Sequence, residues 1–168
     1  MNVLLRYGAI AGAVLAVLMF GPYFIFGARP DWMKAGQVFG YASMVLCLSA
    51  TVFAMRQVRD AAPSPPGYGR LLGVGVGVSA VAAAIFAVAT WVFYALAGDA
   101  LPQALYDFYA NGIRDSGAPT ESIAAQLAEL ERMKPFFWNR PLQAAVMFAT
   151  VFVVGVVESA VGAWFVRR

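Results

Sequence analysis

The stretch from Leu71 to Ala97 reads LLGVGVGVSAVAAAIFAVATWVFYALA and contains no charged residue. At 1.5 Å per residue, a helix of this length would be about 40 Å long, which exceeds the hydrocarbon core of a bilayer at about 30 Å. The stretch therefore predicts a transmembrane helix that tilts or extends beyond the lipid. A closed β-barrel is not indicated, because the apolar residues run continuously instead of alternating.

Three further apolar stretches accompany this one, at residues 7–26, 38–55 and 142–166. Pro22 interrupts the first, and Glu158 is the only charged residue of the last. The stretch at 38–55 is the shortest of the set. Because a spanning helix needs roughly 20 apolar residues, the sequence predicts an all-α polytopic membrane protein. We expect one integral membrane domain over residues 1–168, with four transmembrane helices.

The composition supports lipid as the solvent of this chain. The sequence is 61% hydrophobic and 12% charged, whereas ordinary soluble domains are about 25% charged. The absence of histidine from the sequence excludes His-ligated zinc, His-based catalytic triads and haem with a His ligand. Cys47 is the only cysteine, so it has no partner for an intrachain disulfide. We expect no metal site and no cofactor.

The first apolar stretch has a signal peptide as its alternative. Its apolar run of about 20 residues is longer than the usual 7–15 of a signal peptide. The best small-residue cleavage site ends at Ala28 and places Phe26 at the −3 position, where a small residue is needed. We therefore expect a retained transmembrane helix.

Arginine density gives the expected orientation. With a cytoplasmic N-terminus, the inner segments carry Arg6, Arg56, Arg59, Arg70, Arg167 and Arg168, with Asp60 as their only acid. The basic residues of the outer segments are spread over more than twice that length, among many acids. Both termini are therefore predicted to be cytoplasmic.

The segment between the third and fourth stretches has helical periodicity of its own, over about residues 100–134. Leu101, Leu105 and Phe108 recur at helical spacing, and Ile123, Leu127 and Leu130 do so again after the turn Gly117-Ala118-Pro119. Thr120 is placed to cap the second helix. This pattern predicts an extracytoplasmic amphipathic helical hairpin, preferably a solvated lid packed on the bundle and alternatively a hairpin lying on the membrane face.

Several short motifs together resemble a known family. They are Tyr7-Gly8-Ala9-Ile10-Ala11-Gly12, Gly40-Tyr41-Ala42-Ser43-Met44, Arg56-Gln57-Val58-Arg59-Asp60, Ser116-Gly117-Ala118-Pro119-Thr120-Glu121-Ser122-Ile123, Asn139-Arg140-Pro141-Leu142 and Glu158-Ser159-Ala160. In this order they resemble domain-of-unknown-function family 4199, which groups uncharacterised bacterial membrane proteins. The resemblance implies a small four-helix protein of the bacterial inner membrane and carries no activity or catalytic residue. The Pro-rich inner loop and Glu158 depart from the family pattern.

Glu158 is the sharpest single feature of the apolar stretches. A carboxylate at that depth costs about 2.5–3.5 kcal/mol on insertion scales, so it should face protein or water. Gly155, Ser159 and Gly162 share its helical face. Arg6 is the first candidate for its counter-charge, with the arginines at 56 and 59 as alternatives. The functional interpretation is a proton or cation site, or a substrate ion pair. The structural interpretation is a helix-packing salt bridge, or a side chain that snorkels toward the cytoplasmic interface.

Glycines spaced four apart provide candidate helix-packing faces. The pairs are Gly8 with Gly12, Gly36 with Gly40, and Gly73 with Gly77. Packing within the chain is the first interpretation and homodimerisation is the second. The run Gly73 to Gly77 is not a nucleotide-binding loop, because it lacks the GxGxxG spacing and no strand precedes it. The sequence also has no basic stripe for nucleic acid.

These observations favour a non-enzymatic membrane component, a scaffold or partner subunit that contacts lipid and either another membrane protein or a second copy. The alternative is a small oligomeric transporter or channel that uses Glu158. A membrane enzyme is third, because the outer carboxylates have no tight spacing; Glu129 and Glu131, for example, do not share a helical face.

Overall fold

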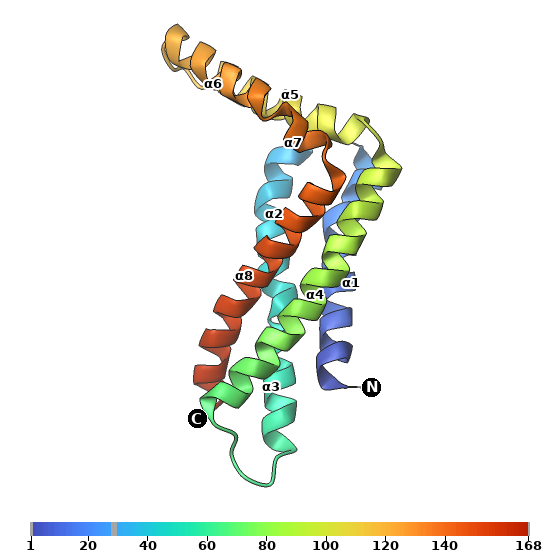
Figure 1. Ribbon diagram of the computed structural model, residues 1–168, viewed down its shortest axis with the longest axis vertical. Coiled ribbons are helices and arrows are strands. Elements are labelled where there is room, and N and C mark those ends of the chain that lie inside the picture. The colour runs from blue at the N-terminus through green and yellow to red at the C-terminus, as the bar shows by residue number, and fades with distance from the viewer. Residues whose placement is uncertain (1, 28–29, 168) are drawn as a thin grey trace.

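The computed structural model describes residues 2–27 and 30–167, and every regular element in this part of the chain is a helix (Figure 1). The elements are α1 (Val3–Phe26), α2 (Pro30–Leu48), α3 (Ala50–Asp60), α4 (Tyr68–Ala97), α5 (Ala100–Arg114), α6 (Thr120–Arg132), α7 (Lys134–Trp138) and α8 (Arg140–Val166). Ala28 and Arg168, which entered the cleavage and charge arguments, lie outside the described residues.

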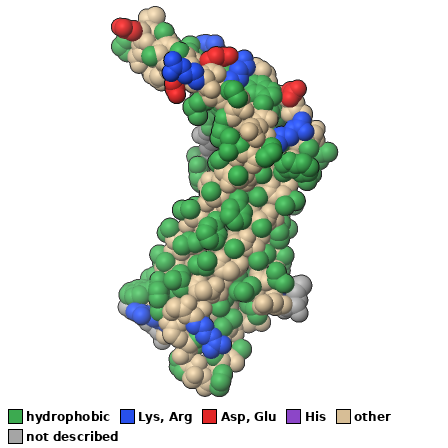
Figure 2. Space-filling view, viewed as in Figure 1, with side chains coloured by type: hydrophobic (Ala, Val, Ile, Leu, Met, Phe, Trp, Pro, Cys, Tyr) green, Lys and Arg blue, Asp and Glu red, His purple; other side chains and the backbone are tan. Residues whose placement is uncertain are grey.

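Four helical segments are long and apolar enough to cross a membrane, as the four apolar stretches predicted. They are Val3–Ile25, Val38–Asp60, Tyr68–Ala97 and Arg140–Val166. Figure 2 shows where the charges lie on one face: they gather over α5 and α6 and at the opposite end, and the middle carries none. An uncharged belt between two charged ends is the surface that a multi-pass membrane protein presents to lipid.

The second span follows the course of the single helix expected over residues 38–55, with a local irregularity at Ser49, whose backbone stays helical (φ −57°, ψ −17°). The Ser49 hydroxyl donates to the Leu46 carbonyl at 2.6 Å, and the Val52 amide donates to the Ser49 carbonyl at 3.0 Å. The first bond lets a side chain compete with the helix ladder, and the second tightens the next turn. The span therefore consists of α2 and α3, which continues the course of α2 to Asp60.

Helix α4 is the centre of the bundle and packs against α1, α3 and α8. Glycines on α1 make one of these contacts close. A Cβ added at Gly8 would lie 2.8 Å from the Val78 carbonyl oxygen, and one at Gly12 would lie 2.7 Å from that of Ala82. This pair is thus occupied by packing within the chain, as the first interpretation of the glycine pairs held.

The other glycine pairs are divided between contact and open space. A Cβ at Gly77 would lie 3.2 Å from Leu4, whereas one at Gly73, a turn earlier, would meet nothing within 4 Å. The other pair is divided in the same way: a Cβ at Gly40 would meet Met19, whereas one at Gly36 would meet nothing within 4 Å. Neither pair forms one continuous packing face inside the chain.

Helices α5 and α6 pack on each other, and together we call them the arm (residues 100–132). Ala110, Leu130 and Phe137 form its small core. Helix α5 lies over the end of the bundle and contacts α2 and α4, whereas the packing partners of α6 are α5 and α7. The expected lid is therefore realised by α5, while α6 projects beside the bundle (Figure 1).

The start of α6 corrects one local expectation. Thr120 is the first residue inside α6 and Pro119 occupies the capping position, with no side-chain cap. Gly117, with φ of 70°, turns the chain sharply before it. A proline with extended ψ can precede a helix directly, so the threonine hydroxyl is not needed at that place.

Candidate functional site

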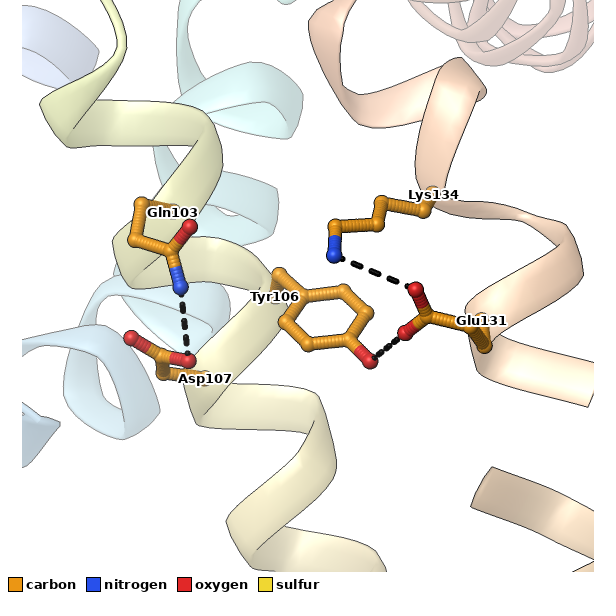
Figure 3. Close-up of polar contacts among 5 residues, drawn as sticks. All are labelled: Gln103, Tyr106, Asp107, Glu131 and Lys134. Carbon is orange, nitrogen blue, oxygen red and sulfur yellow. Dashed lines mark hydrogen bonds and ion pairs between the residues drawn. The ribbon is translucent and has the colours of Figure 1, made fainter. Parts of the chain in front are cut away.

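Three side chains from three helices form a polar clasp on the arm (Figure 3). Tyr106 of α5 donates its hydroxyl hydrogen bond to Glu131 of α6. Lys134 of α7 donates to the other carboxylate oxygen of Glu131 at 3.1 Å, and its ammonium lies 5.2 Å from the centre of the Tyr106 ring. The clasp therefore holds the end of α6 against α5 and against the start of α7.

The clasp changes the titration of each of its members. The hydrogen bond to Glu131 raises the pKa of the Tyr106 phenol. The hydrogen bond from Tyr106 lowers the pKa of the Glu131 carboxyl, and the hydrogen bond from Lys134 lowers it further. The hydrogen bond to Glu131 in turn raises the pKa of the Lys134 ammonium. At neutral pH the trio is thus held as a neutral phenol, a carboxylate and an ammonium. Because these groups bond to one another, the arrangement indicates a structural role.

Helix α7 connects the clasp to α8 through two side-chain hydrogen bonds. The Asn139 side chain accepts a hydrogen bond from the Leu142 amide at 3.1 Å and so caps α8. The buried Gln143 donates its side-chain amide to the Phe136 carbonyl at 3.1 Å. Two hydrogen bonds therefore join α7 and the residue after it to the start of the last spanning helix.

A second polar feature, which we call the serine seam, lies inside the bundle where α4 meets α8. The hydroxyl oxygens of Ser79 and Ser159 are 3.5 Å apart, and both side chains are fully buried. Each hydroxyl also donates to a carbonyl of its own helix, Ser79 to Gly75 at 2.9 Å and Ser159 to Gly155 at 2.6 Å. Back-bonding of this kind satisfies a hydroxyl in lipid without a cavity or a water.

The small residues around the seam allow the helices to approach closely. A Cβ added at Gly75 would collide with Ser159 and Met55, and one at Gly155 would collide with Ser79. Gly162, one turn after Ser159, would carry a Cβ 2.9 Å from Val52 of α3. The predicted packing residues Gly155, Ser159 and Gly162 therefore do lie at helix interfaces, and α4 supplies the partners Ser79 and Gly75.

Glu158 borders this interface and is half-buried. Within the described part of the chain, its Oε1 oxygen has no hydrogen-bond partner, and no ion pair includes it. The ion pair predicted with Arg6 is therefore not formed. Arg6 lies on α1, and α4 packs against both α1 and α8 and so keeps these two helices apart.

Neither of the alternative counter-charges, Arg56 and Arg59, forms an ion pair with Glu158 in the described part of the chain. Arg59 is engaged elsewhere, because it bonds to the Asp60 carboxylate at 3.0 Å and to the Val166 carbonyl at 3.0 Å. Arg56 is exposed and is in none of the ion pairs found among residues 2–27 and 30–167. Among the described residues, Glu158 is thus a carboxyl group in an apolar span without a compensating charge.

Thr51 is a buried polar residue that the sequence did not single out. Its side chain is fully buried, and its Oγ1 has no hydrogen-bond partner in the described residues. It lies one turn after Leu48 and one turn before Met55, both of which are fully buried. A lone threonine in an apolar run was the available signal, but such residues normally bond back to their own helix.

The family match agrees with the resemblance seen in the sequence. The model of the family described as "Protein of unknown function (DUF4199)" matches residues 6–168. Comparison with curated proteins and with solved structures gives no match. No group of three or more Cys, Asp or Glu side chains in the described residues is arranged to hold a metal ion.

Proposed function

Because this chain belongs to the family of unknown function DUF4199, we propose a role from its own geometry: a non-enzymatic membrane subunit whose arm holds a partner protein beside the bundle. The observation that carries this proposal is the projection of α6. Its packing partners are α5 and α7, so its remaining sides lie beside the bundle without a spanning helix against them.

The arm is suited to binding because it is already ordered. Tyr106, Glu131 and Lys134 fix α6 relative to α5 and α7, and the core around Leu130 holds the two long helices together. A surface that is rigid before association loses less conformational entropy when a partner binds. On this surface Glu121 is exposed, and Glu129 is paired with Arg132 at 3.5 Å.

The charge distribution sets the proposed orientation. Arg6, Arg56, Arg59, Arg70 and Arg167 lie at the end opposite the arm, where the chain termini lie. Positive residues favour the cytoplasmic side. We therefore place both termini in the cytoplasm and the arm outside, in the inner membrane of a bacterium as the family resemblance implies.

Site-specific photo-crosslinking tests the proposal. A photoreactive residue at Ala124 or Ala128, both exposed on α6, should give one discrete protein adduct in native membranes. The same residue at the exposed, lipid-facing Val153 of α8 is the matched control and should give only lipid adducts. A protein that stays solitary at both arm positions, and monomeric in mild detergent, would refute a scaffold or subunit role.

A second function rests on Glu158. Glu158 lies inside a span, and its Oε1 oxygen has no hydrogen-bond partner among the described residues, as is typical of the ionisable residues that mark ion pathways. In this reading the protein is a small oligomeric transporter or channel. Proton or cation flux into liposomes should fall in the Glu158→Gln variant and remain in Val157→Leu. Flux that is equal in the two variants would exclude Glu158 as the site.

A further inference from the structure

A groove lies at the end of the bundle opposite the arm, between the start of α4 and the last turns of α8. Its volume is about 520 Å³, and it is lined by Tyr68, Ala160, Val161, Trp164 and Arg167. Sites for small ligands commonly have volumes of about 300–1,000 Å³. The groove is therefore large enough for a headgroup and the first part of an acyl chain.

The groove opens toward the face of α8 that lipid would cover. Val161 in its wall is 54% exposed, and Val157 and Phe165 on either side are exposed as well. Large apolar side chains exposed in a row along a spanning helix are in contact with acyl chains. A ligand that enters sideways from the bilayer reaches the groove without crossing polar protein surface.

The wall of the groove is fixed by contacts within the protein. The Tyr68 hydroxyl donates to the Ala160 carbonyl at 3.3 Å and so joins α4 to α8. The Arg167 guanidinium lies over the Tyr68 ring, 5.7 Å from its centre. Behind these residues, Met55, Leu71 and Ala163 form a buried cluster. The cation is thus held beside an apolar floor.

Arg167 supplies the positive charge of the groove. Among the ion pairs of the described residues, none includes Arg167. Asp60, the last residue of α3, is paired with Arg59 at 3.0 Å. Glu158, two residues before Ala160, lies deeper in the span than the mouth of the groove. Arg70 adds a further exposed cation in the first turn of α4. An anion is therefore the complementary ligand for the mouth of the groove.

We propose that this groove binds one anionic phospholipid. The headgroup phosphate lies at the Arg167 guanidinium, the glycerol region lies beside Tyr68 and Trp164, and one acyl chain follows Ala160 and Val161. Aromatic residues with a polar edge prefer this headgroup depth. A lipid is favoured over a soluble phosphate because most of the wall is apolar and the opening faces the hydrocarbon.

Native mass spectrometry of the full, delipidated chain in a neutral detergent tests this proposal. Phosphatidylglycerol and phosphatidylcholine with identical acyl chains are titrated against wild type, Arg167→Gln, Val161→Trp and Arg56→Gln. The last variant is the matched control, since it removes one exposed arginine at the same end but outside the groove. Wild type should bind one phosphatidylglycerol in preference to phosphatidylcholine.

The two groove variants separate charge from shape. Arg167→Gln should weaken phosphatidylglycerol binding about fivefold, the effect of roughly one surface arginine, and leave phosphatidylcholine unchanged. Val161→Trp should fill the groove and weaken both lipids, and Val161→Phe replaces it if that variant does not fold. Arg56→Gln should behave as wild type.

Three results would overturn the proposal. Equal losses in Arg56→Gln and Arg167→Gln would show general attraction to a basic end, and equal binding of the two lipids would remove the anionic preference. Full competition by inorganic phosphate would show a soluble-anion site instead. The groove lies at the far end from the arm, so its test is independent of the crosslinking experiment.

Discussion

The arm and the serine seam satisfy their polar groups in opposite ways. In the arm, Tyr106, Glu131 and Lys134 bond to one another across three helices on the exposed surface. In the seam, each hydroxyl of Ser79 and Ser159 bonds to its own helix, and the helices then meet through small residues. The difference shows that polar groups connect helices in the arm, whereas close packing connects them inside the bundle.

The largest effect is expected where the seam depends on a missing side chain. Gly155→Leu places a side chain against Ser79 and Leu48, so it should destabilise the bundle by about 3 kcal/mol or prevent folding. Gly73→Leu, which enters open space, is the control and should change stability by less than about 0.5 kcal/mol. Unfolding in mixed detergent micelles measures both. Equal stabilities would refute packing as the link.

Removal of the uncompensated carboxyl should have the next largest effect. Glu158→Leu eliminates a buried oxygen without a partner and should stabilise the folded protein by about 1–3 kcal/mol in the same unfolding assay. Val157→Leu, on the exposed side of the same turn, should be nearly neutral. A loss of stability in Glu158→Leu would mean that the carboxylate has a partner in the membrane, such as a second copy of the chain.

Removal of a buried hydroxyl should change the free energy of unfolding in opposite directions, depending on whether that hydroxyl is hydrogen-bonded. Thr51→Val removes a hydroxyl that lacks a partner and keeps the shape, so it should stabilise by about 1 kcal/mol. Ser79→Ala removes a hydroxyl that is bonded to its own helix, and it should cost about 0.5–1 kcal/mol, the usual net contribution of one hydrogen bond. Effects of the same sign in the two variants would contradict the distinction between satisfied and unsatisfied hydroxyls.

Opening of the clasp should affect the arm and leave the spans unchanged. Tyr106→Phe keeps the ring and removes the hydrogen bond to Glu131. Amide hydrogen exchange should become faster in α6 and stay unchanged in α4 and α8. Gln103→Ala, which removes an exposed bond to Asp107 within α5 alone, is the matched control. Unchanged protection of α6 would show that the apolar core of the arm suffices.

The pH dependence of the clasp is the mildest test. Its bonds lower the pKa of Glu131 from an ordinary value of 4.5. The contribution of the ionised Glu131 carboxylate to the stability of the arm is therefore complete above pH 4.5, and it is lost as the pH falls through the lowered pKa. The Leu127 methyl resonances of wild type and Tyr106→Phe should differ at pH 7 and converge in acid. Curves that stay parallel would exclude this carboxylate as the source.

The spans were predictable because each is a long apolar run, and the arm because its apolar residues recur at helical spacing. The local irregularity at Ser49 was not, since serine inside a helix usually leaves the hydrogen-bond ladder regular. The pairing of Arg6 with Glu158 was inferred from depth alone, and depth does not reveal that α4 lies between their helices. The sequence did contain a signal for the serine seam, because Gly75 and Ser79 are four residues apart, as are Gly155 and Ser159.

The connections of the arm have a mechanical consequence. Its first helix continues from α4 through Gly98, which has φ of 60°, and its return continues into α8 through the cap at Asn139. The helices that carry the arm are therefore the same two that the serine seam joins. A force that pulls α5 and α6 apart is therefore transmitted to α4 and α8, and the close packing of these two helices along the serine seam resists it.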